Sequence, residues 1–325
     1  MTAIRPIDLT ALAAVVWLAG GGAAVAQVPP PPEGAPTTPA LTRLLEGRGE
    51  VKRVATGFGF AQDLVWDGES LLVADRGRGQ LLRVGTPTRI LLPEPGLAAV
   101  ALDTGGQLIA VSGGERRMLR LGEDRRSVLV EQEDREPLAQ PADLVVSRDG
   151  RIFVADLAGE SGRIVEIGAD RERRVVVDDL VRPTGVALAP DGQTLYVSDA
   201  GRSELRAYAL AEGEVGEGRR LASIVPWKRG VRGAPEKMTL DEDGRIYLAG
   251  PGGIWVLDRR GGRLGVIATP ETPTACAFGD ADRRTLYITA RSSVYKVRLK
   301  VEGAPTAGGN SSATRQPASR PRPVT

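Results

Sequence analysis

The sequence predicts an all-β protein: a six-bladed β-propeller with four-stranded antiparallel blades around a central funnel. One unit recurs six times: a tight turn, a strand, a Gly/Arg/Ser-rich loop and a second β-rich segment. The turns recur roughly every 40 to 50 residues, the length of one four-stranded blade, and a generic β-sandwich would not repeat one unit in this way. The turns are Asp67-Gly68, Thr104-Gly105, Asp149-Gly150, Asp191-Gly192, Asp243-Gly244 and Asp282-Arg283.

The clearest copy of this unit is residues 182–199. Two β-rich segments, 186–189 and 194–198, flank the hairpin-like turn Pro190-Asp191-Gly192. In a closed ring of blades the funnel floor is built from the loops that precede the inner strands. Candidate functional side chains are therefore expected on those loops.

Both ends of the chain differ in composition from the repeats. Residues 1–26 have an apolar segment and an Ala24-Val25-Ala26 site, which predicts a cleaved signal peptide and a secreted or periplasmic protein; an uncleaved membrane anchor is the alternative. Residues 27–50 start as a Pro-rich linker, with a short helix or turn near 40–46. The propeller is expected over 51–302, and the Gly/Ser/Pro-rich tail 303–325 is expected to be disordered.

Composition excludes several functions. The 43 basic and 41 acidic residues nearly balance, which argues against nucleic acid as a partner, and no membrane partner is expected once the signal peptide is removed. The chain has no histidine, which rules out a Ser-His-Asp triad and a His-ligated zinc site. The single cysteine, Cys276, can form no intrachain disulfide and is expected to be a small buried apolar residue.

Four segments carry a family resemblance. They are 60–67 (FAQDLVWD), 141–150 (PADLVVSRDG), 183–192 (PTGVALAPDG) and 272–279 (TPTACAFG). Together they resemble the gluconolactonase, senescence-marker-protein and luciferin-regenerating-enzyme family. The resemblance implies a six-bladed propeller with one divalent cation, commonly calcium, at the funnel centre and hydrolysis of sugar lactones or related esters.

At the family's metal-site positions the sequence is altered. Gln62, followed by Asp63, stands where the family has Glu, and Thr184 replaces an Asn. Ala142 replaces the Asn before Asp143. Glu236 replaces an Asp and is followed by Lys237 in place of Gly. The resemblance leaves a degenerate ligand set of Gln62, Asp63, Asp143, Thr184 and Glu236. No cofactor is expected beyond a weakly held calcium or other divalent cation, and the Lys237 ammonium is expected to take part of the cation's electrostatic role.

Two functions remain open. The first is lactone or ester hydrolysis of a small sugar-lactone-like molecule, with Glu236 or Asp143 as general base and with Gln62, Thr184 and Lys237 binding the substrate. The second is a non-catalytic binding propeller, similar to NHL-type repeats, that presents loops 76–79 and 202–204 to a protein or glycan. Aspartates at strand ends are expected to accept hydrogen bonds from loop backbone within a blade. These are Asp75, Asp156 and Asp199.

Overall fold

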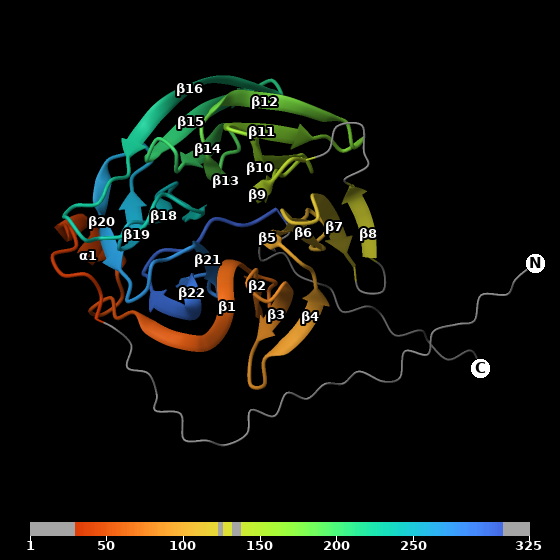
Figure 1. Ribbon diagram of the computed structural model, residues 1–325. Coiled ribbons are helices and arrows are strands. Elements are labelled where there is room, and N and C mark those ends of the chain that lie inside the picture. Colours follow the sequence, from red (N-terminus) through yellow and green to blue (C-terminus); the bar gives the residue numbers. More distant parts are fainter. Residues whose placement is uncertain (1–29, 123–125, 132–137, 308–325) are drawn as a thin grey trace, which may run out of the picture.

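The computed structural model, described here for residues 30–122, 126–131 and 138–307, is an all-β propeller. Antiparallel sheets follow one another around a central channel in chain order (Figure 1). The all-β propeller expected from the repeats is confirmed. Each of the six expected turns connects an inner strand to the next strand of its sheet.

The strands form five hydrogen-bonded sheets. The first contains β1 (Lys52–Trp66), β2 (Leu71–Asp75), β3 (Gln80–Val84), β4 (Arg89–Pro93), β21 (Ala275–Gly279) and β22 (Thr285–Arg298). The second contains β5 (Leu97–Leu102), β6 (Leu108–Ser112), β7 (Arg117–Leu121) and β8 (Arg126–Val130). The third contains β9 (Pro141–Val146), β10 (Ile152–Ala158), β11 (Ser161–Ile167) and β12 (Arg173–Leu180). The fourth contains β13 (Pro183–Leu188), β14 (Thr194–Asp199), β15 (Glu204–Ala211) and β16 (Glu214–Ser223). The fifth contains β17 (Met238–Leu240), β18 (Ile246–Gly250), β19 (Gly253–Leu257) and β20 (Arg263–Ala268).

The expectation of six separate four-stranded sheets is wrong in its count. The reason is β1, which is 15 residues long and pairs with two partners. Its first part, residues 52–56, pairs with β22, and its second part, residues 61–66, pairs with β2. Hydrogen bonding therefore continues from β21 through to β4, and the two ends of the repeat region share one six-stranded sheet.

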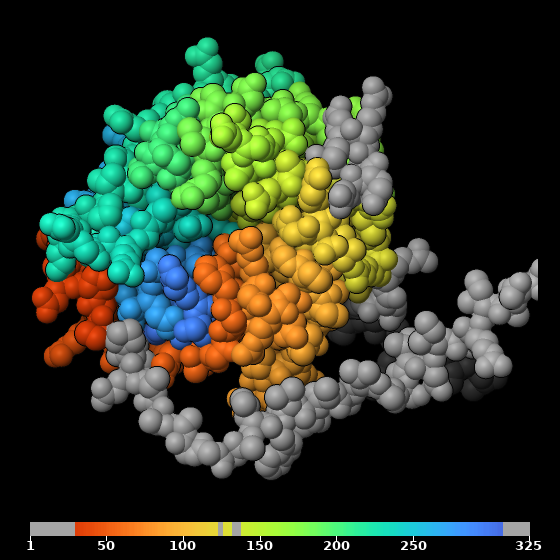
Figure 2. All heavy atoms as spheres, in the orientation of Figure 1, coloured from red at the N-terminus to blue at the C-terminus, as the bar shows by residue number. Residues whose placement is uncertain are grey.

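The apolar core lies between neighbouring sheets. One cluster joins Val65 and Leu72 of the first sheet to Val100 and Leu108 of the second. Others repeat this arrangement around the ring, so the sheets pack face to face as adjoining sectors (Figure 2). Because burial of apolar side chains between sheets fixes each sheet against the next, the inner strands are held rigidly around the channel.

Both terminal segments pack on the propeller within the described residues. The helix α1 (Pro39–Leu44) is capped by Thr38 and buries Leu41 and Leu44, which confirms the short helix expected near residues 40–46. Residues 303–307 also have defined positions: Gly303 N donates to Arg283 O at 2.8 Å, and Ala304 N donates to Leu240 O at 2.9 Å. The expected signal peptide, residues 1–26, and the remainder of the expected tail lie outside the described residues.

Candidate functional site

Five of the inner strands share one irregularity where they begin, at the end of the channel called the upper face. In β1, β5, β9 and β13 the pairing register shifts by one residue, so that one residue has no partner in the next strand. At the start of β17, Ala249 faces two residues, accepting from Glu236 N at 2.8 Å and donating to Lys237 O at 2.9 Å. Such bulges re-aim side chains, here toward the channel.

Two rings of residues result. The upper ring contains the residues without a partner and Glu236: Gln62, Ala98, Ala142, Thr184 and Glu236. The lower ring contains the residue that follows each: Asp63, Ala99, Asp143, Gly185 and Lys237. The strand pairing thus places all six predicted metal and substrate positions, Lys237 included, in two adjacent layers at the top of the channel.

Buried aspartates hold the loops that lead into these rings. Asp75 accepts from Gly59 N at 2.9 Å and from Phe60 N at 2.8 Å. Asp199 accepts from Val181 N at 2.9 Å and from Arg182 N at 3.0 Å, and Asp156 makes equivalent contacts to residues 139 and 140. Charged acceptors of backbone N–H groups make strong hydrogen bonds. The aspartates at strand ends therefore fix the entry of three inner strands, as expected.

At the centre of the lower ring lies Lys237. Its side chain is 3 % exposed, and Nζ lies 2.9 Å from Asp63 Oδ2 and 3.1 Å from Asp143 Oδ1. The ammonium also donates to the carbonyl oxygen of Ala98 at 2.7 Å. A lysine ammonium has three N–H donors, and all three have an acceptor here.

The two aspartates also bridge neighbouring inner strands. Asp63 Oδ2 accepts from Val100 N, and Asp143 Oδ2 accepts from Val186 N, both at 2.9 Å. Burial raises the pKa of Asp143 to about 6, although the Lys237 charge acts to lower it. Burial alone would lower the pKa of Lys237, but the charges of Asp143 and Asp63 outweigh it and raise that pKa. The group is therefore a buried ion cluster with the ammonium charged.

The upper ring holds the half-buried carboxylate of Glu236. Burial raises the pKa of Glu236 to about 7, against the lowering effect of the charges on Lys237, Arg182 and Arg291. Among the described residues, no hydrogen bond or ion pair engages this carboxylate. A carboxylate with a pKa near neutrality and free lone pairs has the properties of a general base.

The other predicted site residues fall into two groups. Thr184 Oγ1 donates to Pro235 O at 2.8 Å, which ties the β13 bulge to the segment that carries Glu236. Gln62 is half-buried in the same ring. Asp63 and Asp143 lie one layer lower and are committed to Lys237 and to backbone N–H groups. We therefore place Glu236 with Gln62 and Thr184, and separate Asp143 from the exposed part of the site.

Three participants were not predicted. The Ala98 carbonyl oxygen accepts from Lys237, and no side-chain motif marks a backbone acceptor. Arg182 and Arg291 both lower the pKa of Glu236, and both side chains are exposed. Arg182 precedes Pro183 and could have been found as a charge beside a predicted ligand position. Arg291, which lies in β22 with φ 48°, gives no such signal.

These residues do not fit a divalent cation. In the described parts of the chain, no three carboxylate or thiolate side chains gather closely enough to hold a metal ion. The Thr184 hydroxyl is directed to Pro235, and a fixed ammonium occupies the oxygens of Asp63 and Asp143. Hard cations need several converging oxygens, and a positive charge at the same point opposes their binding.

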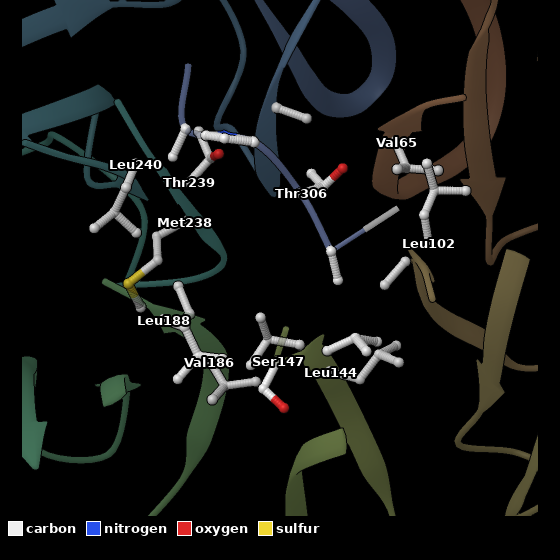
Figure 3. A pocket seen from close by; sticks show the side chains of 18 of the residues that line it. Val65, Leu102, Leu144, Ser147, Val186, Leu188, Met238, Thr239, Leu240 and Thr306 are labelled. Carbon is white, nitrogen blue, oxygen red and sulfur yellow. The ribbon is translucent and has the colours of Figure 1, made fainter. Parts of the chain in front are cut away.

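Toward the end where the inner strands finish, the channel widens into a cavity of about 370 Å³. Its walls are mainly apolar, with Leu102, Leu144, Leu188 and Met238 around Thr306 of the C-terminal segment (Figure 3). Asp63, Asp143 and Lys237 line this cavity, whereas Gln62, Thr184 and Glu236 do not. The ion cluster of Asp63, Asp143 and Lys237 therefore separates the upper ring from this mainly apolar cavity, called the lower cavity.

The fold and this site define the class: a β-propeller whose central channel is lined by polar and charged side chains from the inner strands. Within that class, the chain belongs to the SMP-30/gluconolactonase/LRE-like family, whose family model matches residues 60–292. The family expected from the sequence motifs is confirmed.

Individual relatives agree with this assignment. A gluconolactonase of Zymomonas mobilis is 26% identical over 307 residues, covering 82% of this chain and 86% of that protein. The structure of a gluconolactonase from Xanthomonas campestris superposes with a TM-score of 0.73 and 26% identity, covering 83% of this chain and 95% of that one. The calcium-binding protein regucalcin of Agrobacterium tumefaciens, at 16% identity and a TM-score of 0.68 over 81% of this chain and 98% of that one, shares the fold.

Proposed function

We propose that the protein hydrolyses lactones or related esters, with Glu236 as the general base. The observation that carries the proposal is the carboxylate of Glu236 in the upper ring, half-buried, without a partner among the described residues and with its pKa raised by burial to about 7. The gluconolactonase relatives support the reaction class. Asp143 has both oxygens engaged, so it does not share the role of base.

The reaction needs one proton acceptor that later becomes a donor. Glu236 takes a proton from water, whose oxygen attacks the lactone carbonyl carbon to form a tetrahedral oxyanion. The bond from this carbon to the ring oxygen then breaks, and the leaving alkoxide takes the proton from Glu236. The product is an open-chain hydroxy acid, and the carboxylate is regenerated.

Positive charge and donors near Glu236 serve the oxyanion. Arg182 and Arg291 are exposed and act on Glu236 through their charge. We assign to these guanidinium groups and to the Gln62 amide the stabilisation of the developing negative charge. Thr184 holds the Glu236 segment through Pro235, and Lys237 adds a fixed charge from below. No step passes through a divalent cation, because the donor set does not fit one.

The test is a hydrolysis assay on several aldonolactones with purified protein. Glu236→Gln should reduce kcat/KM by at least about 100-fold, the usual contribution of a general base. Glu69→Gln, an exposed turn carboxylate, is the matched control and should retain activity. Absence of hydrolysis by a correctly folded wild-type protein would refute the enzyme and favour the non-catalytic binding propeller.

Two further parts of the proposal concern architecture and location. We propose that the six-stranded sheet combines two of six repeats. Leu299 N donates to Arg284 O at 2.8 Å, so the two ends of β22 lie side by side and β22 folds back on itself. Its two halves then count as two strands. One repeat is then β21, both halves of β22 and residues 52–56 of β1. We also propose export through residues 1–26, to be tested by N-terminal sequencing of the protein recovered outside the cytoplasm. In the described part of the chain, no helix is long and apolar enough to cross a membrane.

A further inference from the structure

We propose that the Lys237 ammonium is a built-in cation that replaces a bound divalent ion as the positive centre of the channel. It reaches from the position just before β17 (Met238–Leu240) across the channel to three other inner strands. Its contacts are Asp63 of β1 at 2.9 Å, the Ala98 carbonyl of β5 at 2.7 Å and Asp143 of β9 at 3.1 Å. A hard metal ion would likewise need several oxygens that converge on it.

The surroundings of Lys237 are built to hold it. The lower ring alternates charged with small residues, since Ala99 follows Asp63 and Gly185 follows Asp143 around the channel. A Cβ atom at Gly185 would lie 2.8 Å from Lys237 Cα and 2.5 Å from Glu236 O, so only glycine admits this approach. Gly185 therefore lets the Glu236–Lys237 backbone lie close against β13, and this approach positions Lys237 at the edge of the channel.

The same contacts explain why the ring needs the ammonium. Asp63 and Asp143 each tie their own strand to the next through Val100 N and Val186 N. Both carboxylates are nearly inaccessible to water, at 9 % and 7 % side-chain exposure, and buried charges are tolerated only when paired. Lys237 supplies that pairing, and through it five inner strands, β1, β5, β9, β13 and β17, are joined.

Removal of the side chain should leave three oxygens, from Asp63, Ala98 and Asp143, facing an empty space. Lys237→Gly creates that space, whereas Lys237→Met removes the charge and keeps most of the volume. The pair of variants therefore separates loss of charge from opening of a cation-sized site. This inference rests on contacts within the fold, and its readouts do not need the proposed hydrolytic activity.

The experiment is thermal unfolding of the full chain with calcium chloride or EDTA, together with calorimetric calcium titration. We expect wild-type Tm to be unchanged by either addition, with no binding heat. Both variants should lose roughly 5–15 °C in Tm, because two buried carboxylates lose their partner. Calcium should raise the Tm of Lys237→Gly and leave that of Lys237→Met unchanged.

Several results would overturn the inference. If the wild-type protein binds calcium stoichiometrically and its Tm rises, a metal site persists and the inference is wrong. This wild-type measurement tests the inference even if neither variant folds. Variants as stable as wild type, or a destabilised Lys237→Gly that gains no calcium response, would show that Lys237 does not stand in for a cation. If hydrolysis is found, it should resist EDTA; if none is found, the melting and titration results still stand.

Discussion

The replacement Glu236→Gln should stabilise the protein above neutral pH and have little effect in acid. Burial raises the folded-state pKa of Glu236 from 4.5 to about 7. A carboxyl group whose pKa is raised on folding contributes its stability below the unfolded pKa and loses it as the pH rises through the folded pKa. The wild-type protein therefore loses stability between about pH 4.5 and pH 7, and the glutamine variant lacks this loss.

The size of the effect follows from the shift. A difference of about 2.5 pKa units corresponds to roughly 3 kcal/mol, which is an upper value for a half-buried group. Urea unfolding of both proteins from pH 4.5 to pH 8.5 should give equal stabilities at the acid end and an advantage for the variant that grows to about 2–3 kcal/mol. Asp143, with its own raised pKa, is present in both proteins, and its contribution largely cancels in the difference.

A second carboxylate provides the control of opposite sign. Burial acts to raise the pKa of Glu271, but hydrogen bonds from Ser293, Tyr295 and Ser292 outweigh it, and the pKa is lowered. Glu271→Gln should therefore destabilise the protein at neutral pH, with a difference that shrinks as the pH falls. If Glu236→Gln gives a constant difference across the range, or one that grows toward acid, the raised pKa and the assignment of Glu236 as base are both refuted.

Asp199→Ala removes the acceptor of four loop N–H groups and should cost about 2–4 kcal/mol in denaturant unfolding; a loss under 0.5 kcal/mol would contradict its role. Arg182→Ala removes a charge that lowers the pKa of Glu236, so the acid limb of the pH–rate profile should move to higher pH, and an unmoved limb would exclude Arg182 from the site. Deletion of residues 303–325 should open the lower cavity and speed maleimide labelling of Cys276 several-fold by mass spectrometry; equal rates would show that this segment does not cover the cavity.

The repeats made the propeller architecture predictable. They did not predict how the two ends of the repeat region join in one six-stranded sheet. Turn residues such as Asp191-Gly192 act locally, through positive φ at Gly192 and a side-chain acceptor at Asp191, so their spacing carries into the fold. The shared six-stranded sheet depends on the pairing of Lys52 with Lys296, which are far apart in the chain. No local pattern specifies such a partner.

The candidate site also divides into positions that the sequence located and contacts that it did not. The family resemblance pointed to Gln62, Thr184 and Glu236, but it did not separate this upper ring from Asp63 and Asp143 one layer below. The partners of Lys237 depend on how far its side chain extends across the channel, which only the packed ring decides. The composition of 303–307 predicts disorder, yet backbone hydrogen bonds and the packing of Ala304 and Ala307 give this segment defined contacts.

The adjacency of Glu236 and Lys237 limits how the proposed reaction can work. A metal ion can both hold the channel together and polarise the substrate carbonyl, because it has coordination positions left for the substrate. The Lys237 ammonium has none left, since all three N–H groups are engaged below the upper ring. Its charge acts at a distance, and direct hydrogen bonds to the oxyanion must come from Arg182, Arg291 or Gln62. Loss of either arginine should therefore lower kcat by more than it raises KM, because charge stabilisation is needed most in the transition state. Equal kcat with only a higher KM would place these arginines in substrate capture and leave the oxyanion to the Gln62 amide.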